Sequence, residues 1–433
     1  MKFSVIAAGD CLFTAAFPEA YKQKRKELDR FLSSADVRLA NLETNLSDFG
    51  GYCNQYSGGT WLNTRKELFR HLETFGFDFY GTANNHCMDY GYGGLLSTAD
   101  FLESRGIAHA GTGRSLEEAE RAAEFTVNGV RYAVFAADAI KMLPSMAGNG
   151  SRIFAARPGV NYLRHTARYK ADAEDMAALK RIAAKCGINF ARDFSVATGY
   201  ALPDKEGEFT FGQAVFTSDA AAADTECDKT DLARIIGGIK KKKEEGCKVF
   251  VLIHCHDNDG TSHSRPPRYL KEFAHAAIDA GAKAVFGGGC HELRGLEIYN
   301  GFPVFYSLGD FIFQLARVEH LPPDYMEKYG LDVNSSAREG LSAREGKKRA
   351  GLRYKEENFL TVLPKITFDE KGVTDITLMP VELAFLPERE EDEGLPAFAA
   401  GEQGEKIYGI LKRLSAPFGT DLVFESGLIK VKI

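Results

Sequence analysis

The sequence predicts an α/β protein built in layers, and three observations support this. Strand-like and helix-like segments alternate through residues 2–138 and again after residue 229. The first strand, KFSVIAAGD at residues 2–10, is apolar almost throughout, which is typical of a strand covered on both faces. Gly76 and Gly106 follow two helix-like segments, as glycines commonly do at helix ends. The repeated β-α-β order favours a layered α/β domain.

The elements of the first third follow from their polarity patterns. Strands are expected at residues 2–10, 37–43, 77–84 and 130–138. Helices are expected at residues 22–36, 64–76 and 93–106. The second of these helices opens with Thr64 and Glu67, the Thr-x-x-Glu pattern of a capped helix start.

The alternation weakens between residues about 140 and 228. This segment holds loops, a helix-like stretch at 169–186 and a run of alanines at 220–223. We interpret it as an insertion in a main domain that spans residues 1–315. Two roles stay open for it: a cap folded over a site, or a structural excursion without a part in chemistry.

Regular alternation returns after the insertion. Two helix–strand pairs are expected, with helices at 230–246 and 266–281 and strands at 247–257 and 282–289. Asn300-Gly301 and residues 369–372 predict the turns of two hairpins. Residues 316–357 are polar and are predicted to form a mobile excursion. Residues 358–433 are predicted to form a β-rich extension packed on the main domain.

Composition excludes several classes of protein. The chain has 433 residues and a net charge of -6, so electrostatics give no reason to expect nucleic-acid binding. The lysines at 240–243 end a predicted helix, where a solvated face explains them. No apolar run approaches the ~18 residues of a transmembrane helix, and Asp10 interrupts any signal peptide. Eight scattered cysteines without a CxxC pair predict reduced thiols in a cytoplasmic protein, although a chain lacking its export signal would look the same.

Polar side chains follow five of the predicted core strands. They include carboxylates, asparagines and histidines, at Asp10, Glu43, Asn84-Asn85-His86 with Asp89, His254-Cys255-His256, and His291. Loops at the carboxyl ends of parallel strands gather at one edge of a sheet. These ligand types suit a divalent cation, and a shared carboxylate could bridge two ions ~3.5–4 Å apart.

Each of these residues also has a purely structural reading. Asp10 could cap a helix, and Glu43 could pair with a neighbouring base. A single His254 is more often a satisfied buried histidine than a ligand. Asn84 and Asn85 could stabilise a turn. The coincidence of five strand ends favours a polar functional site.

These motifs resemble those of the CapA family, also called PgsA, which is associated with poly-γ-glutamate capsule synthesis. The similar motifs are GD at 9–10, NLE at 41–43, ANNHCMDYG at 83–91, HELRGLEIYNGFPVFYSLGDFIF at 291–313 and LSAPFGT at 414–420. The resemblance covers residues 3–138, 230–313 and 359–420. It implies a calcineurin-like metallophosphatase fold, a four-layer α/β/β/α sandwich, here with an insertion and a C-terminal extension.

The resemblance also implies residue roles. One or two divalent ions (Mn, Zn or Fe) would be held by Asp10, a bridging Glu43, Asn85, His254 and His291. His86 would face the reacting oxyanion, and Asp89 would hold His86 in the right tautomer.

The chain departs from the family pattern at the second metal position. Gly288 and Gly289 stand where the family has histidines, and Leu12 stands where true phosphatases have the histidine of an Asp-x-His pair. His256 replaces the glycine of the family's His-Trp-Gly and is an extra candidate ligand. Cys290 could donate a thiolate, but a buried thiol is the commoner state.

The preferred function is therefore a metal-dependent hydrolase of a phosphoester or amide-type centre, with an anionic small-molecule or polyglutamate-type substrate. The alternative is a non-catalytic binding or assembly component of poly-γ-glutamate capsule synthesis with a degraded metal site. A nucleotide-binding Rossmann enzyme is disfavoured, because the chain has no GxGxxG motif.

Overall fold

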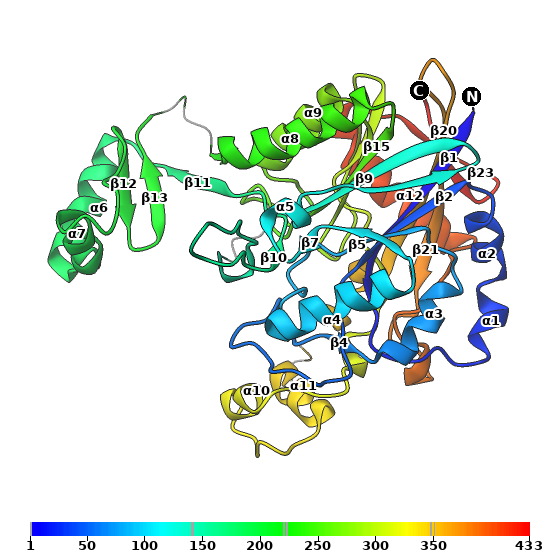
Figure 1. Cartoon of the computed structure of the whole chain (residues 1–433), viewed down its shortest axis with the longest axis horizontal. Coiled ribbons are helices and arrows are strands. Elements are labelled where there is room, and N and C mark those ends of the chain that lie inside the picture. Colours follow the sequence, from blue (N-terminus) through cyan, green and yellow to red (C-terminus); the bar gives the residue numbers. More distant parts are fainter. Residues whose placement is uncertain (1, 140–142, 220, 222–223, 347–348, 350) are drawn as a thin grey trace.

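The computed structural model describes residues 2–139, 143–219, 221, 224–346, 349 and 351–433 (Figure 1). Its largest sheet is formed by Phe3–Leu12 (β1), Val37–Leu42 (β2), Phe79–Gly81 (β5), Ala108–Ala110 (β6), Asp310–Phe313 (β19), Leu360–Phe368 (β20), Val373–Leu383 (β21), Pro396–Phe398 (β22), Leu422–Glu425 (β23) and Leu428–Val431 (β24). The strand order is β23-β24-β21-β20-β1-β2-β5-β6, with β19 beside β1 and β22 beside β21.

A second large sheet has the order β17-β18-β16-β15-β9-β8. Its strands are Leu296–Tyr299 (β17), Phe302–Phe305 (β18), Ala282–Gly288 (β16), Lys248–His254 (β15), Val130–Asp138 (β9) and Ala123–Val127 (β8). The turn between β17 and β18 is at Asn300 and Gly301, both with positive φ, which confirms the predicted hairpin. The turn between β20 and β21 falls at residues 369–372, which confirms the second predicted hairpin.

The helices that cover the sheets are short to medium in length. They span Tyr21–Lys24 (α1), Lys26–Leu32 (α2), Arg70–Glu73 (α3), Gly91–Ser104 (α4), Leu116–Ala119 (α5), Lys229–Glu244 (α8), Arg268–Ala280 (α9), Pro323–Lys328 (α10), Ala337–Glu345 (α11) and Glu402–Ser415 (α12). Within the described ranges, no helix is long and apolar enough to cross a membrane. All eight cysteines are free, as predicted.

Three apolar clusters define the layers of the body. In β1, Val5 points into a cluster shared with Phe250 and Phe286 of the second sheet, so the two sheets pack face to face. The next residue, Ile6, points the other way, into a cluster that includes α2, α3, α10 and α11. A third cluster joins the outer face of the second sheet to α8 and α9. The predicted α/β protein with several sheets is thus confirmed.

The strand registers bring the polar strand ends together. In the first sheet β1, β2 and β5 run parallel, and Asp10 pairs in register with Asn41 of β2 and Asp310 of β19. In the second sheet β9, β15 and β16 run parallel, and His254 lies in register with Gly288. The carboxyl ends of both parallel sets therefore meet at one edge of the body.

The insertion forms a small subdomain of its own. Its four-stranded sheet has the order β12-β13-β11-β14, made by Glu208–Phe211, Ala214–Thr217, His165–Lys170 and Thr225–Cys227, and it carries helices Ala173–Cys186 (α6) and Phe190–Ala197 (α7). Figure 1 shows α6 and α7 to the side of the body rather than over it. Most of the alanine run lies outside the described residues.

Two predicted helices begin later than expected. The stretch from 169 is strand β11 until residue 170, and α6 starts at 173 because the Asp172 side chain accepts from Asp175 N (2.8 Å). The helix predicted at 64–76 is present as a 3₁₀ turn at Lys66–Phe69 followed by α3, and only its cap at Thr64 is wrong. Thr64 belongs to strand Asn63–Thr64 (β4), paired with Asn45–Leu46 (β3), and its hydroxyl donates to the carbonyl of Phe13 rather than capping a helix.

The remaining segments join the body. Residues 316–357 contain α10 and α11, and their Tyr325, Met326 and Leu341 are buried against the first sheet, so the excursion has an apolar side; its mobility stays a prediction. Strand β20 pairs antiparallel with β1, with Val5 opposite Ile366. The C-terminal extension therefore completes the first sheet itself.

Candidate metal centre

Two Gly-Asp pairs place two carboxylates side by side. Asp10 lies near the end of β1, which is buried throughout, and Asp310 begins β19 in register with it. A Cβ atom on Gly9 would lie 1.9 Å from the carbonyl oxygen of Gly309, so only glycine permits this approach of the backbones. Both carboxylates are buried.

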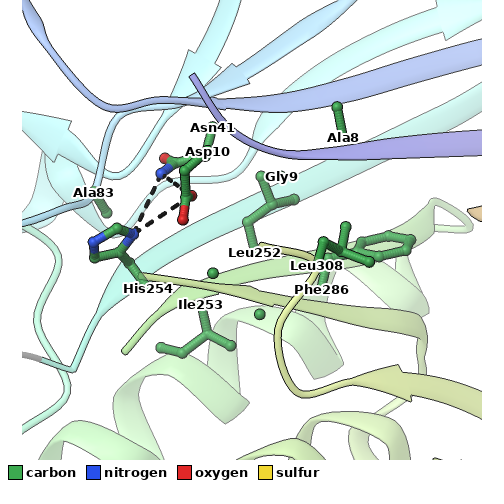
Figure 2. Close-up of a pocket in the computed structure, with 12 residues that line it drawn as sticks. Ala8, Gly9, Asp10, Asn41, Ala83, Leu252, Ile253, His254, Phe286 and Leu308 are labelled. Carbon is green, nitrogen blue, oxygen red and sulfur yellow. Dashed lines mark hydrogen bonds and ion pairs between the residues drawn. The ribbon is translucent and has the colours of Figure 1, made fainter. Parts of the chain in front are cut away.

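Hydrogen bonds fix the orientation of Asp10. Asn41 Nδ2 donates to Asp10 Oδ1 (2.7 Å), and Gly289 N donates to Asp10 Oδ2 (2.6 Å). His254 Nδ1 lies 3.6 Å from Asp10 Oδ1 (Figure 2). Burial opposes ionisation, but His254 and these hydrogen bonds together hold the pKa of Asp10 below its ordinary value. Asp10 is therefore a ready anionic ligand.

Glu43 is the unusual residue of the site. Its side chain is 0% exposed, and neither of its carboxylate oxygens has a hydrogen-bond partner among the described residues. Burial and the charges of Asp10 and Asp310 raise the pKa of Glu43 well above its usual range. A buried carboxylate without partners is costly, and a divalent cation would supply the missing partner.

His254 is held between two amides. Asn41 Nδ2 lies 3.3 Å from His254 Nδ1, and Asn85 Oδ1 lies 2.9 Å from His254 Nε2. An amide nitrogen donates and an amide oxygen accepts, so both contacts are satisfied by the tautomer with its proton on Nε2. Asn85 Nδ2 in turn donates to the carbonyl of Gly58 (2.8 Å).

His86 is oriented by Asp89. The distance from His86 Nδ1 to Asp89 Oδ2 is 2.6 Å, and Asp89 also accepts from Gly58 N (2.9 Å) and Leu62 N (2.7 Å). Burial raises the pKa of Asp89, although His86 and these hydrogen bonds oppose the shift. The other ring nitrogen of His86 lies 3.8 Å from Glu43 Oε1. His86 therefore faces the carboxylate from a fixed position.

Two groups of side chains have the spacing of a metal site, and they share Glu43. Within each group the ligand atoms lie within 4.8 Å of one another, and the groups are Asp10, Glu43 and His254, and Glu43, His256 and His291. His291 Nδ1 lies 3.0 Å from Asp310 Oδ1. Burial and the neighbouring histidines lower the pKa of His256 well below its ordinary value, which keeps its imidazole neutral. Neutral imidazole is the form that binds metals.

The two glycines at 288 and 289 change how Asp10 is held. A Cβ atom on Gly288 would lie 2.5 Å from Asp10 Oδ1. A side chain there would displace the Asp10 carboxylate, which instead accepts from Gly289 N. Cys290 is buried, and burial raises the pKa of its thiol.

The sequence placed Asn41 and Asn84 at strand ends without giving either a role in the site, and it did not single out Asp310. Asn84 Oδ1 accepts a hydrogen bond from His86 N (3.1 Å). Asp310 contacts His291, and burial raises the pKa of Asp310 to about 6 even though His291 opposes the shift. A signal for Asp310 was available, since Gly309-Asp310 repeats the Gly9-Asp10 pair that ends the first strand.

Fold and site together define a mixed α/β protein with a buried histidine–carboxylate cluster of metal-binding spacing. The family model described as "Bacterial capsule synthesis protein PGA_cap" matches residues 4–315, so the chain belongs to this family.

Relatives span the chain to different extents. The protein y4uA of Sinorhizobium fredii is 29% identical over 441 residues, which covers 99% of this chain and 93% of that protein. The PGA biosynthesis protein CapA of Bacillus subtilis is 26% identical and covers 58% of this chain and 47% of its own length. The capsule biosynthesis protein CapA of Bacillus anthracis is 21% identical, with 66% and 53% covered.

Proposed function

We propose that the chain is a metal-dependent hydrolase with a metallophosphatase-like α/β/β/α fold. The observation that carries this proposal is Glu43, a buried carboxylate at the junction of two ligand groups that has no hydrogen-bond partner among the residues that the structure describes. Its desolvation is offset most directly by one or two divalent ions, Mn, Zn or Fe, with Asp10, Asn85, His254, His256 and His291 as further ligands.

Divalent ions held by these residues would supply the activation of a water for attack on a phosphoester or amide-type centre. The side chains of the protein orient the histidines and stabilise the charge that develops on the substrate. Asp89 accepts from His86 Nδ1 and fixes the ring, so that protonated His86 donates through Nε2 to the charge that develops on the substrate. Asp310 orients His291 in the same way. The names of the Bacillus relatives support a poly-γ-glutamate-related substrate for this chain.

Metal analysis coupled to a substrate panel tests the proposal. The purified protein is expected to hold up to two equivalents of metal and to turn over p-nitrophenyl phosphate, its diester, or a γ-glutamyl anilide. Asp10→Ala should lower both metal content and turnover, whereas Asp193→Ala, an exposed residue of α7, should change neither. Turnover that survives Asn85→Ala and His86→Ala together would contradict the roles assigned to them.

A second function, a non-catalytic binding or assembly component of capsule synthesis, is favoured by one observation. The resemblance predicts histidines where this chain has Gly288 and Gly289, so two of the ligands expected for the family are absent. This function predicts a protein that binds glutamate polymers with no bound metal and no turnover on the panel.

A further inference from the structure

A cleft of about 760 Å³ lies outside the metal centre, between the loop after β15 and the end of α12. One wall is the loop at 259–266, and the other is the LSAPFGT segment at 414–420 with the residue before it. That volume falls within the roughly 300–1,000 Å³ of small-ligand sites. Both walls are tied to the elements that carry the metal-site histidines.

The LSAPFGT wall is fixed to β17. Ser415 is fully buried, and its hydroxyl accepts from Leu296 N (3.0 Å). Phe418 stacks on Tyr306 with 5.0 Å between the ring centres. The segment therefore holds the end of α12 against the strand that follows His291.

The loop wall is fixed by a buried arginine. Arg294 is 1% exposed, and its Nη2 donates to the carbonyls of Asp257 (2.7 Å) and His263 (3.0 Å). The His263 side chain pairs with Glu292 (2.5 Å). The loop at 259–266 begins three residues after His256, and Arg294 lies three residues after His291. The same short segments therefore support both the cleft and the metal centre.

The charges in the cleft are mostly positive. Arg265, Lys271 and Arg413 come from three different elements, against one carboxylate, Asp259. Asp259 accepts from Thr261 N (2.9 Å) and Ser262 N (3.0 Å) and lies 3.9 Å from Arg265. Within the described part of the chain, Lys271 and Arg413 have no carboxylate partner. Two cations and the hydroxyls beside them are left for a ligand.

We propose that this cleft binds an anionic polymer, with successive carboxylates of one chain paired to Lys271 and Arg413, and with Arg265 adding to the positive charge of the cleft. Cations that project from three elements into one cleft suit several anionic groups on one ligand better than a single small anion. The cleft shares its supporting segments with the metal centre. It needs no catalysis, so it holds equally for a hydrolase and for a binding protein.

Binding of a fluorescent γ-linked glutamate decamer to the full chain tests the site. Lys271→Glu with Arg413→Glu should weaken binding at least tenfold and flatten its salt dependence. The matched control, Lys240→Glu with Lys241→Glu, makes the same change in net charge on exposed residues of α8 and should change binding less than twofold. Lys271→Arg should bind like the parent.

Two results would overturn the assignment. One is that the cleft and control variants lose decamer affinity equally, or that neither loses it, while the unfolding temperatures of the variants stay unchanged. The other is inorganic phosphate binding as tightly as the decamer, which would make the ligand a single small anion. Asp10→Ala is expected to keep decamer binding, so failure of the metal-dependent function and failure of this site give different results.

Discussion

The two ligand groups that share Glu43 are built differently. In the carboxylate group, Asp10 and His254 are each held by two side-chain or backbone partners, and both are buried. In the histidine group, His256 is only partly buried and its ring contacts another histidine, His254, at 3.2 Å. The first group is the more buried and the more tightly held, whereas the second is more open to solvent. We expect a first ion to bind the carboxylate group more tightly than a second ion binds the histidine group, with one amide contact of His254 giving way to the ion.

The largest effect is expected where the groups meet. Glu43→Gln should abolish binding of both ions, because it removes the shared charge. A ligand at 100 times its Kd stabilises a fold by about 2.7 kcal/mol, and this gain should be lost. Thermal unfolding with and without Mn²⁺ measures it. The control Glu174→Gln, exposed on α6, should keep the full shift. A Glu43→Gln protein that still gains stability from Mn²⁺ would remove Glu43 from the site.

The next effect should separate the two groups. Asp310→Asn removes the charge that orients His291 and should weaken the second ion by about 10–100-fold, the usual cost of losing such a support. The first ion should be much less affected, since its group is held by Asn41 and Asn85. Isothermal titration with Mn²⁺ would show two binding steps, of which only the second has a lower affinity than in the parent protein. Equal weakening of both steps would show that the groups are not distinct.

Adding a side chain at Gly288, rather than removing one from the site, tests how tightly Asp10 is packed. Gly288→His restores a family ligand type, yet its Cβ would lie 2.5 Å from Asp10 Oδ1. The variant should therefore bind the first ion more weakly and lose about 1–3 kcal/mol of stability from overpacking. Gly288→Ala carries the same Cβ without the imidazole and should behave alike. If Gly288→His bound metal more tightly than the parent, the glycine would be a lost ligand position rather than a packing requirement.

The sequence predicted the layered α/β architecture and both hairpins. It also singled out strand-end residues that the structure brings together: Asp10, Glu43, His254, His256 and His291. These follow from local patterns: apolar strands, Asn-Gly turns and polar residues at strand ends. It gave Asp310 and Asn41 no role in the site because their roles depend on register between strands far apart in the chain. It misread Thr64 because the competing partner, the carbonyl of Phe13, lies 51 residues away. A local sequence motif cannot predict a hydrogen bond to a backbone group that is distant in the sequence.

A pH dependence should distinguish the metal-free from the loaded protein. Burial raises the folded-state pKa of Asp310 to about 6 and that of Glu43 above its ordinary value. The folded state then holds more protons than the unfolded state, so metal-free stability should fall as pH rises from about 4 through 6. Bound Mn²⁺ should reverse this trend. Unfolding temperatures across pH 4–8 test it, and Glu43→Gln should flatten the metal-free profile.

The smallest effect is expected in the insertion. Phe194 of α7 is 62% exposed, on a subdomain that Figure 1 shows beside the body. Phe194→Ser should change stability by less than about 0.5 kcal/mol and leave both Mn²⁺-binding steps unchanged, because an exposed side chain away from the site has no packing to lose. A weakened metal step in this variant would mean that the insertion reaches the open histidine group. That result would favour the interpretation of the insertion as a cap over the partly buried His256.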